Sequence, residues 1–229
     1  MLIIFTITLL VVITNTKAMI DDYNKIAKSD NVGVYLYAKK INGLYTDFII
    51  DFQGHILLKP YWINTTNPTW APKIIYEDIS QDGRKELVII LTKGTGTGVL
   101  NREVHIFQIQ QQKINNKQDV VPVEVLIDDP IEIILKNVKT GLTSSMANII
   151  IGEKKYDIDI QNFGIQPEHL FDDIFFGNII NFEIKNSQLI AMIGGQISPA
   201  GGYIGDIEIT YKFKDKMYQA NSIKFISSK

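Results

Sequence analysis

A nine-residue stretch of the sequence has the residue types and spacing of a cation-binding loop. Residues 78–86 read DISQDGRKE, with oxygen-bearing side chains at positions 1, 3, 5 and 9 and a glycine at position 6. A hard cation such as calcium binds about six to eight oxygen ligands, and one tight loop can supply most of them. We therefore expect the metal ligands to be the side-chain oxygens of Asp78, Ser80, Asp82 and Glu86 and the carbonyl oxygen of Arg84.

The residues that follow distinguish this loop from an EF-hand. An EF-hand loop leads into a helix, whereas Leu87–Leu91 is an apolar, β-branched run typical of a buried strand. Position 12 of the loop is Ile89, where an EF-hand has glutamate. The alternative interpretation is a polar β-turn in which Asp and Gly serve only the backbone conformation.

A loop of the form D-x-[DNS]-x-D-G-x-x-[DE] that runs straight into an apolar strand resembles the FG-GAP/VCBS-type calcium loop. That family occurs in secreted bacterial proteins and in integrin-like β-propellers. The longer segment 62–109 is also similar to small exported proteins of Bacillus-type bacteria without an assigned function. The resemblance implies calcium (Ca2+) as the cofactor, with a serine at position 3 where the family prefers Asp or Asn. The sequence holds one copy of the loop, whereas a propeller needs several blades at a fixed period.

Two other motifs favour a structural interpretation over a chemical one. The Gly-Thr alternation of Gly94–Gly98 follows a strand, but no Lys-Ser/Thr comes after it and residues 99–109 favour another strand. We therefore expect a hairpin connection there and not a phosphate-binding loop. His105 lies within the second of these strands, where we expect a hydrogen-bonded sheet residue.

A group of acidic residues in the second half could belong to a hydrolase. Asp172 and Asp173 lie close to Glu168 and His169, and paired carboxylates are the groups that glycoside hydrolysis uses. The preceding Pro167 favours instead a short helical turn with acidic residues at its start. No G-x-S-x-G motif or cysteine is present, and a triad assembled from distant residues stays open.

Four aromatic residues cluster around one predicted loop: Tyr61, Trp62, Trp70 and Tyr76. Exposed aromatic rings stack on sugars or peptides, whereas buried ones cover the edge of a β core. The sequence therefore keeps a cell-wall glycan or a protein as possible partners.

The composition limits the other classes of partner and site. Hydrophobic residues make up 45% and charged residues 21%, which is typical of a globular chain. The 23 Lys and Arg nearly balance the 25 Asp and Glu, so we expect no broad basic field and no nucleic-acid partner. Without cysteine the chain has no disulfide and no thiolate zinc site. The abundance of Ile and the excess of Lys over Arg fit a low-GC Gram-positive bacterium.

The amino terminus predicts export. Residues 1–13 form an apolar run of the length of a secretory signal, and Thr16-Lys17-Ala18 places small residues before a cleavage site after Ala18. The run is shorter than the ~20 residues of a membrane-spanning helix. We expect residues 1–18 to be a signal peptide and the protein to be secreted or at the cell surface. Contact with a membrane is expected only if this segment is not cleaved.

Alternating apolar and polar residues predict strands over most of the mature chain. The first predicted region, 19–110, begins with a possible helix at 21–29 and continues with strands at 32–38, 47–52, 55–58, 74–76, 87–91 and 104–109, with a loop at 61–72. The polar stretch 110–118 is expected to be a hairpin tip or a linker and is the candidate boundary between two subdomains, with one continuous domain as the alternative. The second region, 119–229, has a helix that starts at Pro130 after Asp129 and ends at Gly141. Three hairpins follow: 146–151 with 156–160, 179–184 with 189–193, and 207–213 with 217–226.

These patterns predict an α+β fold that is mainly antiparallel β, with one or two helices packed on the sheets. The expected function is a non-enzymatic binding or structural module with a calcium-type loop. The alternative is an extracellular hydrolase whose catalytic residues are dispersed along the chain.

Overall fold

The structure, a computed structural model, describes residues 20, 22–114, 117–199 and 201–228 of the 229. The predicted signal peptide, 1–18, lies outside the described residues. The chain divides into two compact units, Met1–Ile74 and Ile75–Lys229. No helix within the described residues has both the length and the apolarity that crossing a membrane requires.

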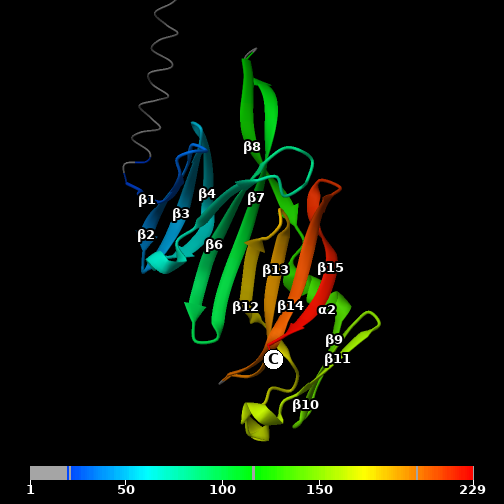
Figure 1. The fold of residues 1–229 in the computed structure, drawn as a ribbon. Coiled ribbons are helices and arrows are strands. Elements are labelled where there is room, and N and C mark those ends of the chain that lie inside the picture. Colours follow the sequence, from blue (N-terminus) through cyan, green and yellow to red (C-terminus); the bar gives the residue numbers. More distant parts are fainter. Residues whose placement is uncertain (1–19, 21, 115–116, 200, 229) are drawn as a thin grey trace, which may run out of the picture. The chain divides into compact units, whose positions relative to one another are not determined.

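The first unit contains a four-stranded antiparallel sheet with the strands in chain order (Figure 1). Its strands are β1 (Asn24–Ser29), β2 (Val34–Ile41), β3 (Leu44–Phe52) and β4 (His55–Thr65). Alternate residues of β2, Val34, Leu36 and Ala38, are fully buried, which is the period-two pattern that the sequence predicts for a strand.

Two predictions for this unit were wrong. In the predicted helix at 21–29, residues 24–29 are not helical, because Asn24–Ser29 pairs antiparallel with β2 and forms an edge strand. The predicted loop 61–72 starts later, because β4 continues to Thr65. Pro60 is tolerated in β4 because it lies on an edge strand, where the register of the pairing with β3 shifts. A short 3-10 helix, Pro68–Trp70, follows β4.

The second unit is built on a large sheet of eight strands (Figure 1). In chain order the strands are β5 (Lys73–Glu77), β6 (Glu86–Gly96), β7 (Val99–Ile114), β8 (Lys117–Ile127), β12 (Phe175–Ile184), β13 (Leu189–Ser198), β14 (Gly201–Lys214) and β15 (Met217–Ser227). Neighbouring strands of this sheet are mainly antiparallel, and the predicted hairpins β12–β13 and β14–β15 are confirmed. In the polar stretch 110–118, expected as a hairpin tip or a linker, residues 110–114 belong to β7 and residues 117 and 118 to β8, and these two strands pair antiparallel.

Two short parallel pairings close part of this sheet into a ring. Ile179 and Ile180 of β12 pair with the start of β7, and Met217 and Tyr218 of β15 pair with the end of β8. The paired strands β7, β12, β13, β14, β15 and β8 therefore form a six-stranded barrel, and β6 and β5 extend the sheet beyond β7. Buried residues of the barrel strands and of β6 make one hydrophobic core, which includes Val88, Ile106, Ile193, Ile209, Tyr211 and Tyr218.

The one α-helix among the described residues begins as predicted. Asp129 caps α2 (Pro130–Asn137), and its carboxylate accepts hydrogen bonds from the amides of Ile131 and Glu132 at 2.8 and 3.1 Å. The predicted end at Gly141 was wrong, because Val138 already starts the next strand. Ile133 and Ile134 bury one face of the helix in the core of the second unit.

A second, three-stranded sheet follows α2. It consists of β9 (Val138–Leu142), β10 (Met146–Ile151) and β11 (Lys154–Asp159), in the order β11-β10-β9. The β10–β11 hairpin and the short helical turn at Pro167–His169 are both as predicted. With strands dominant and a single α-helix in the described part of the chain, the fold is mainly antiparallel β, closer to all-β than to the expected α+β.

Candidate metal centre

The predicted cation loop connects β5 to β6 and is curled by its own backbone. Gln81 and Gly83 both have positive φ angles, 62° and 87°, which reverse the chain within a few residues. The Asp78 carboxylate lies inside this turn and accepts hydrogen bonds from the amides of Asp82 at 3.2 Å and Gly83 at 2.9 Å. Ile79, between two polar residues of the loop, is 4% exposed and anchors it in the core of the second unit.

Three carboxylates of the loop converge on one point. Oxygen atoms of Asp78, Asp82 and Glu86 all lie within 4.8 Å of one another. Two oxygens that bind the same calcium ion are separated by up to about 4.6 to 5.2 Å, which is twice the usual calcium–oxygen distance. The loop therefore brings together three hard oxygen donors at a separation that one such ion can span.

Glu86 is the most buried of the three carboxylates. Its side chain is 2% exposed at the start of β6, and it accepts hydrogen bonds from the amides of Ile79 at 2.9 Å and Ser80 at 3.3 Å. Within the described residues neither Lys nor Arg forms an ion pair with Glu86 or Asp78. Buried carboxylates are usually paired with a cation or coordinate a metal, so this arrangement favours a bound cation.

Asp82 has a partner of opposite charge. The Arg84 guanidinium donates to its carboxylate at 2.6 and 3.1 Å, and the Arg84 amide donates to the other oxygen at 2.9 Å. These hydrogen bonds hold the pKa of Asp82 below its ordinary value. A cation that binds Asp82 therefore shares its carboxylate with the Arg84 guanidinium.

The remaining predicted ligands have different positions. The Ser80 hydroxyl donates to the Asp78 carboxylate at 3.5 Å, so it borders the group of carboxylates. Arg84 was predicted to contribute its carbonyl oxygen, and the contacts that define it here are those of its guanidinium and its amide with Asp82. Three of the five predicted ligands thus converge directly, and Ser80 lies beside them.

One residue near this site was missed by sequence reasoning. Tyr218, at the start of β15, is completely buried in the same core cluster as Ile79, and its hydroxyl has no hydrogen-bond partner among the described residues. Burial raises the pKa of Tyr218, and the charges of Glu86, Asp82 and Asp78 raise it further. This hydroxyl is a buried polar atom within the electrostatic reach of all three carboxylates. Nothing in its sequence surroundings links it to a loop more than 130 residues away.

The acidic residues considered for a hydrolase do not form a comparable group. Glu168, His169, Asp172 and Asp173 are all exposed. Asp173 accepts a hydrogen bond from the Thr140 hydroxyl at 2.7 Å. In the described part of the chain, the loop carboxylates are the one group of His, Asp and Glu side chains close enough to share an ion.

The glycine-rich segment 94–98 and His105 both have the structural roles in the sheet that the sequence predicts. Gly94–Gly98 lies at the β6–β7 hairpin, and a strand follows it. His105 is a strand residue, and its Nδ1 lies 2.8 Å from a carboxylate oxygen of Glu124.

The aromatic residues do not make one exposed surface. Trp62 is 7% exposed and packs edge-on against Phe48, with ring centroids 5.8 Å apart. Its neighbour Tyr61 points outward and is 92% exposed. Trp70 and Tyr76 are half-buried. For Trp62 the structure supports the interpretation that it covers a β core.

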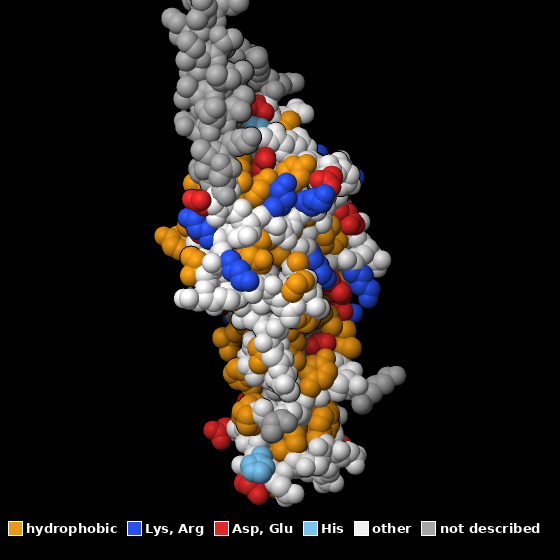
Figure 2. Space-filling view, turned by 90° about the vertical axis from the view of Figure 1, so that its left-hand side faces the viewer, with side chains coloured by type: hydrophobic (Ala, Val, Ile, Leu, Met, Phe, Trp, Pro, Cys, Tyr) orange, Lys and Arg blue, Asp and Glu red, His pale blue; other side chains and the backbone are white. Residues whose placement is uncertain are grey.

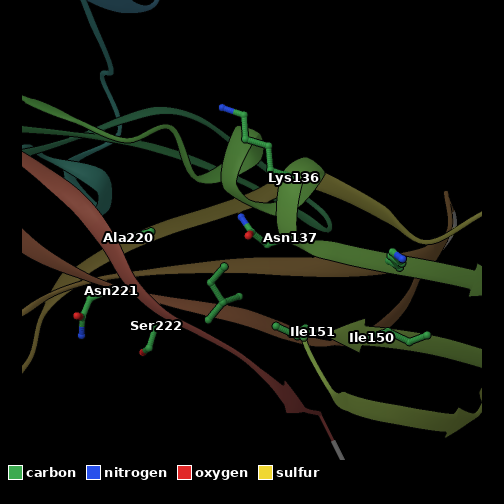
Figure 3. Close-up of a pocket in the computed structure, with 10 residues that line it drawn as sticks. Lys136, Asn137, Ile150, Ile151, Ala220, Asn221 and Ser222 are labelled. Atoms are coloured by element: carbon green, nitrogen blue, oxygen red, sulfur yellow. The ribbon is translucent and has the colours of Figure 1, made fainter.

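A groove of the second unit with a volume of about 700 Å³ has no residue of the acidic loop in its lining. Figure 3 shows Ala220, Asn221 and Ser222 of β15 on one side and Ile150 and Ile151 of β10 on another, with the end of α2 above. The groove is lined by two lysines and by apolar and amide side chains, and no carboxylate is among them. On the face drawn in Figure 2, basic, acidic and hydrophobic side chains are intermingled.

Fold and site together define a β-barrel protein with an acidic loop at the edge of the barrel sheet. No family model matches the sequence, and neither a curated protein nor a solved structure matches the chain.

Proposed function

We propose that the protein is an extracytoplasmic, non-enzymatic binding or structural module in which the 78–86 loop binds a divalent cation, with calcium as the expected ion. The observation that carries the proposal is the convergence of Asp78, Asp82 and Glu86 within 4.8 Å. A single guanidinium, that of Arg84, offsets the charge of these carboxylates through Asp82. The oxygen donors are hard ligands of the kind that calcium and magnesium prefer over softer metals.

Two observations favour a cation site over a simple polar turn. A turn explains why Asp78 accepts hydrogen bonds from backbone amides, because Asp side chains do so in many turns. It does not explain why Glu86 is buried beside two other carboxylates, or why the Tyr218 hydroxyl is buried near them without a partner. A bound cation compensates the negative charge of the three carboxylates and orders the groups around the Tyr218 hydroxyl.

The role of the cation in this proposal is structural. Binding to the folded loop and not to the unfolded chain stabilises the fold by mass action, by about 2.7 kcal/mol when the free ion is at 100 times its dissociation constant. The resemblance to the FG-GAP/VCBS-type calcium loop supports the same role.

Calorimetric titration with calcium tests the proposal directly. The protein is first stripped with a chelator and then titrated in parallel with an Asp82→Ala variant and an Asp172→Ala control. We expect binding to the intact protein and the control, and none to Asp82→Ala. Absence of binding to the intact protein at millimolar calcium would contradict the proposal and leave the loop as a turn.

The export part of the proposal rests on the sequence of residues 1–18. Mass spectrometry of the protein recovered from a culture tests it. A chain that starts at Met19 in the medium or on the cell surface is expected. A full-length chain held in the membrane fraction would instead identify the apolar terminus as an anchor.

A further inference from the structure

Tyr218 links the acidic loop to the closure of the barrel. It is one of the two β15 residues that pair with β8, and this pairing closes one seam of the ring. Its carbonyl oxygen accepts a hydrogen bond from the Asp128 amide at 2.9 Å, just after β8 ends. The Asp128 carboxylate in turn accepts from the Ala220 amide at 3.1 Å. The backbone of Tyr218 is therefore fixed at the seam between β8 and β15.

The side chain of the same residue lies in the core cluster that also contains Ile79 of the loop and Val88 of β6. The ring packs against Phe213, with centroids 5.3 Å apart, and the whole side chain is inaccessible to solvent. Its hydroxyl lacks a hydrogen-bond partner within the described residues, although Asp78, Asp82 and Glu86 act on it electrostatically. A buried hydroxyl without a hydrogen-bond partner is unfavourable, because buried polar groups in folded proteins are normally hydrogen-bonded.

A neighbouring tyrosine shows the usual solution. Tyr211, on the adjacent strand β14, is 1% exposed, and its hydroxyl donates to the Asp128 carbonyl oxygen at 3.1 Å. Both buried tyrosines thus contact Asp128 at the seam, Tyr211 through its hydroxyl and Tyr218 through its backbone carbonyl. The hydroxyl of Tyr211 has its hydrogen bond within the barrel, whereas that of Tyr218 is buried without a partner among the described residues.

We propose that Tyr218 is a positioning residue of the cation site, whose hydroxyl donates a hydrogen bond on the inner side of the ion-bound loop and so couples cation binding to the β8–β15 seam. This inference rests on the proposed cation site and names the part of the barrel that responds to it. Glu86 is the expected acceptor, directly or through a water on the ion, because it is the most buried of the three carboxylates. The cation then orders both the loop and the strand pairing that closes the barrel.

The test compares Tyr218→Phe with Tyr211→Phe in calcium and in chelator. Tyr218→Phe is expected to weaken calcium binding at least about fivefold in calorimetry and to reduce the rise in melting temperature that calcium produces. In chelator its melting temperature should equal or exceed that of the wild type, because the variant removes an unpartnered buried hydroxyl. Tyr211→Phe should lower the melting temperature in both conditions and leave calcium affinity unchanged.

Amide hydrogen exchange provides a readout at the seam itself. In the wild type, calcium should slow exchange of the Asp128 and Ala220 amides, and in Tyr218→Phe this slowing should be lost even at saturating calcium. Equal calcium affinity and equal slowing in wild type and Tyr218→Phe would overturn the inference while leaving the cation site intact. If the wild type itself binds no calcium, the proposed function fails first, and the inference fails with it.

Discussion

Two segments of the second unit carry three carboxylates each, and only one of them brings the carboxylates together. In the 78–86 loop they lie within 4.8 Å of one another. In the 167–173 segment Glu168, Asp172 and Asp173 are exposed, and no shared group forms. Both segments are rich in acid, so acid content alone does not make the difference.

The backbone explains the contrast. The 78–86 loop reverses through Gln81 and Gly83 with positive φ, and its first carboxylate lies inside the turn. The other segment is a 3-10 turn, Pro167–His169, that continues with Leu170 in an extended conformation. The extended chain carries its later carboxylates away from Glu168. An acidic segment becomes a candidate site when its backbone curls around a point and an adjacent strand fixes the last ligand.

The largest expected effect comes from removing the carboxylate inside the turn. Asp78→Ala should abolish calcium binding in calorimetry, a loss of at least about 100-fold, which corresponds to about 2.7 kcal/mol. It should also destabilise the chelated protein by about 1 kcal/mol, because two backbone amides lose their acceptor. Glu168→Ala is the matched control, and a similar loss in that variant would remove the contrast between the segments.

The second-largest effect is expected at Glu86, where a substitution can remove the negative charge and keep a hydrogen-bond acceptor. Glu86→Gln keeps an oxygen that can accept from the Ile79 amide but removes the negative charge. We expect calcium affinity to fall by about tenfold or more, or about 1.4 kcal/mol. Chemical denaturation in chelator should show equal or higher stability, because an uncompensated buried charge is gone. A large loss of stability in chelator would mean that the charge has another role.

A smaller effect, an increase in calcium affinity, is expected when Arg84 is replaced. Arg84→Ala removes the guanidinium that competes for the Asp82 carboxylate but keeps the backbone carbonyl. Because the ion pair is exposed and screened by solvent, calcium affinity should rise only by about two- to fivefold. Calorimetry of this variant beside Lys155→Ala, which removes an ion pair remote in sequence from the loop, measures the change. Weaker binding in Arg84→Ala would contradict the competition.

The pH dependence of Asp82 follows from the same ion pair. Its pKa is lowered in the folded protein by the Arg84 guanidinium. The carboxylate therefore stabilises the fold above its unfolded pKa of about 3.9, and this contribution is lost as the pH falls through the lower folded pKa. The effect on stability is small because Arg84 is exposed. Carboxyl NMR titration of the chelated protein should show the Asp82 pKa rising in Arg84→Ala, and an unchanged pKa would refute this cause.

The smallest effect is expected in the segment that does not converge. Asp172→Ala should leave calcium affinity unchanged and stability within about 0.5 kcal/mol, because its carboxylate is exposed. Thermal melts in calcium and in chelator measure both. A calcium-dependent change in this variant would show that the 167–173 segment contributes to a cation site after all.

Local patterns predicted much of this fold. Asp129 and Pro130 locate the start of the helix because capping is decided by neighbouring residues. The alternation of apolar and polar residues locates the hairpins, because this pattern also depends only on residues that are close in the sequence. The 21–29 segment failed because its pairing with β2, and not its own propensity, makes it a strand. The predicted mainly antiparallel β architecture is confirmed, but the described residues are closer to an all-β fold than to the expected α+β fold.

The site was predictable to the same extent. Spacing within one loop identifies Asp78, Asp82 and Glu86, because their convergence depends on local turns. Tyr218 was not identifiable, because it joins the same core cluster as Ile79 of the loop through tertiary packing between residues far apart in the sequence.

The two short parallel pairings that close the barrel have a consequence for how the chain folds. Each joins residues about 80 to 90 positions apart, Leu100 with Ile179 and Ile127 with Tyr218, and each extends over only two residue pairs. The hairpins have local contacts and form quickly, whereas joining distant segments costs loop-closure entropy before it yields stabilising contacts. We expect ring closure to be the late, rate-limiting event of refolding. One of the two closures includes Tyr218, so calcium in the refolding buffer should hasten the final kinetic phase.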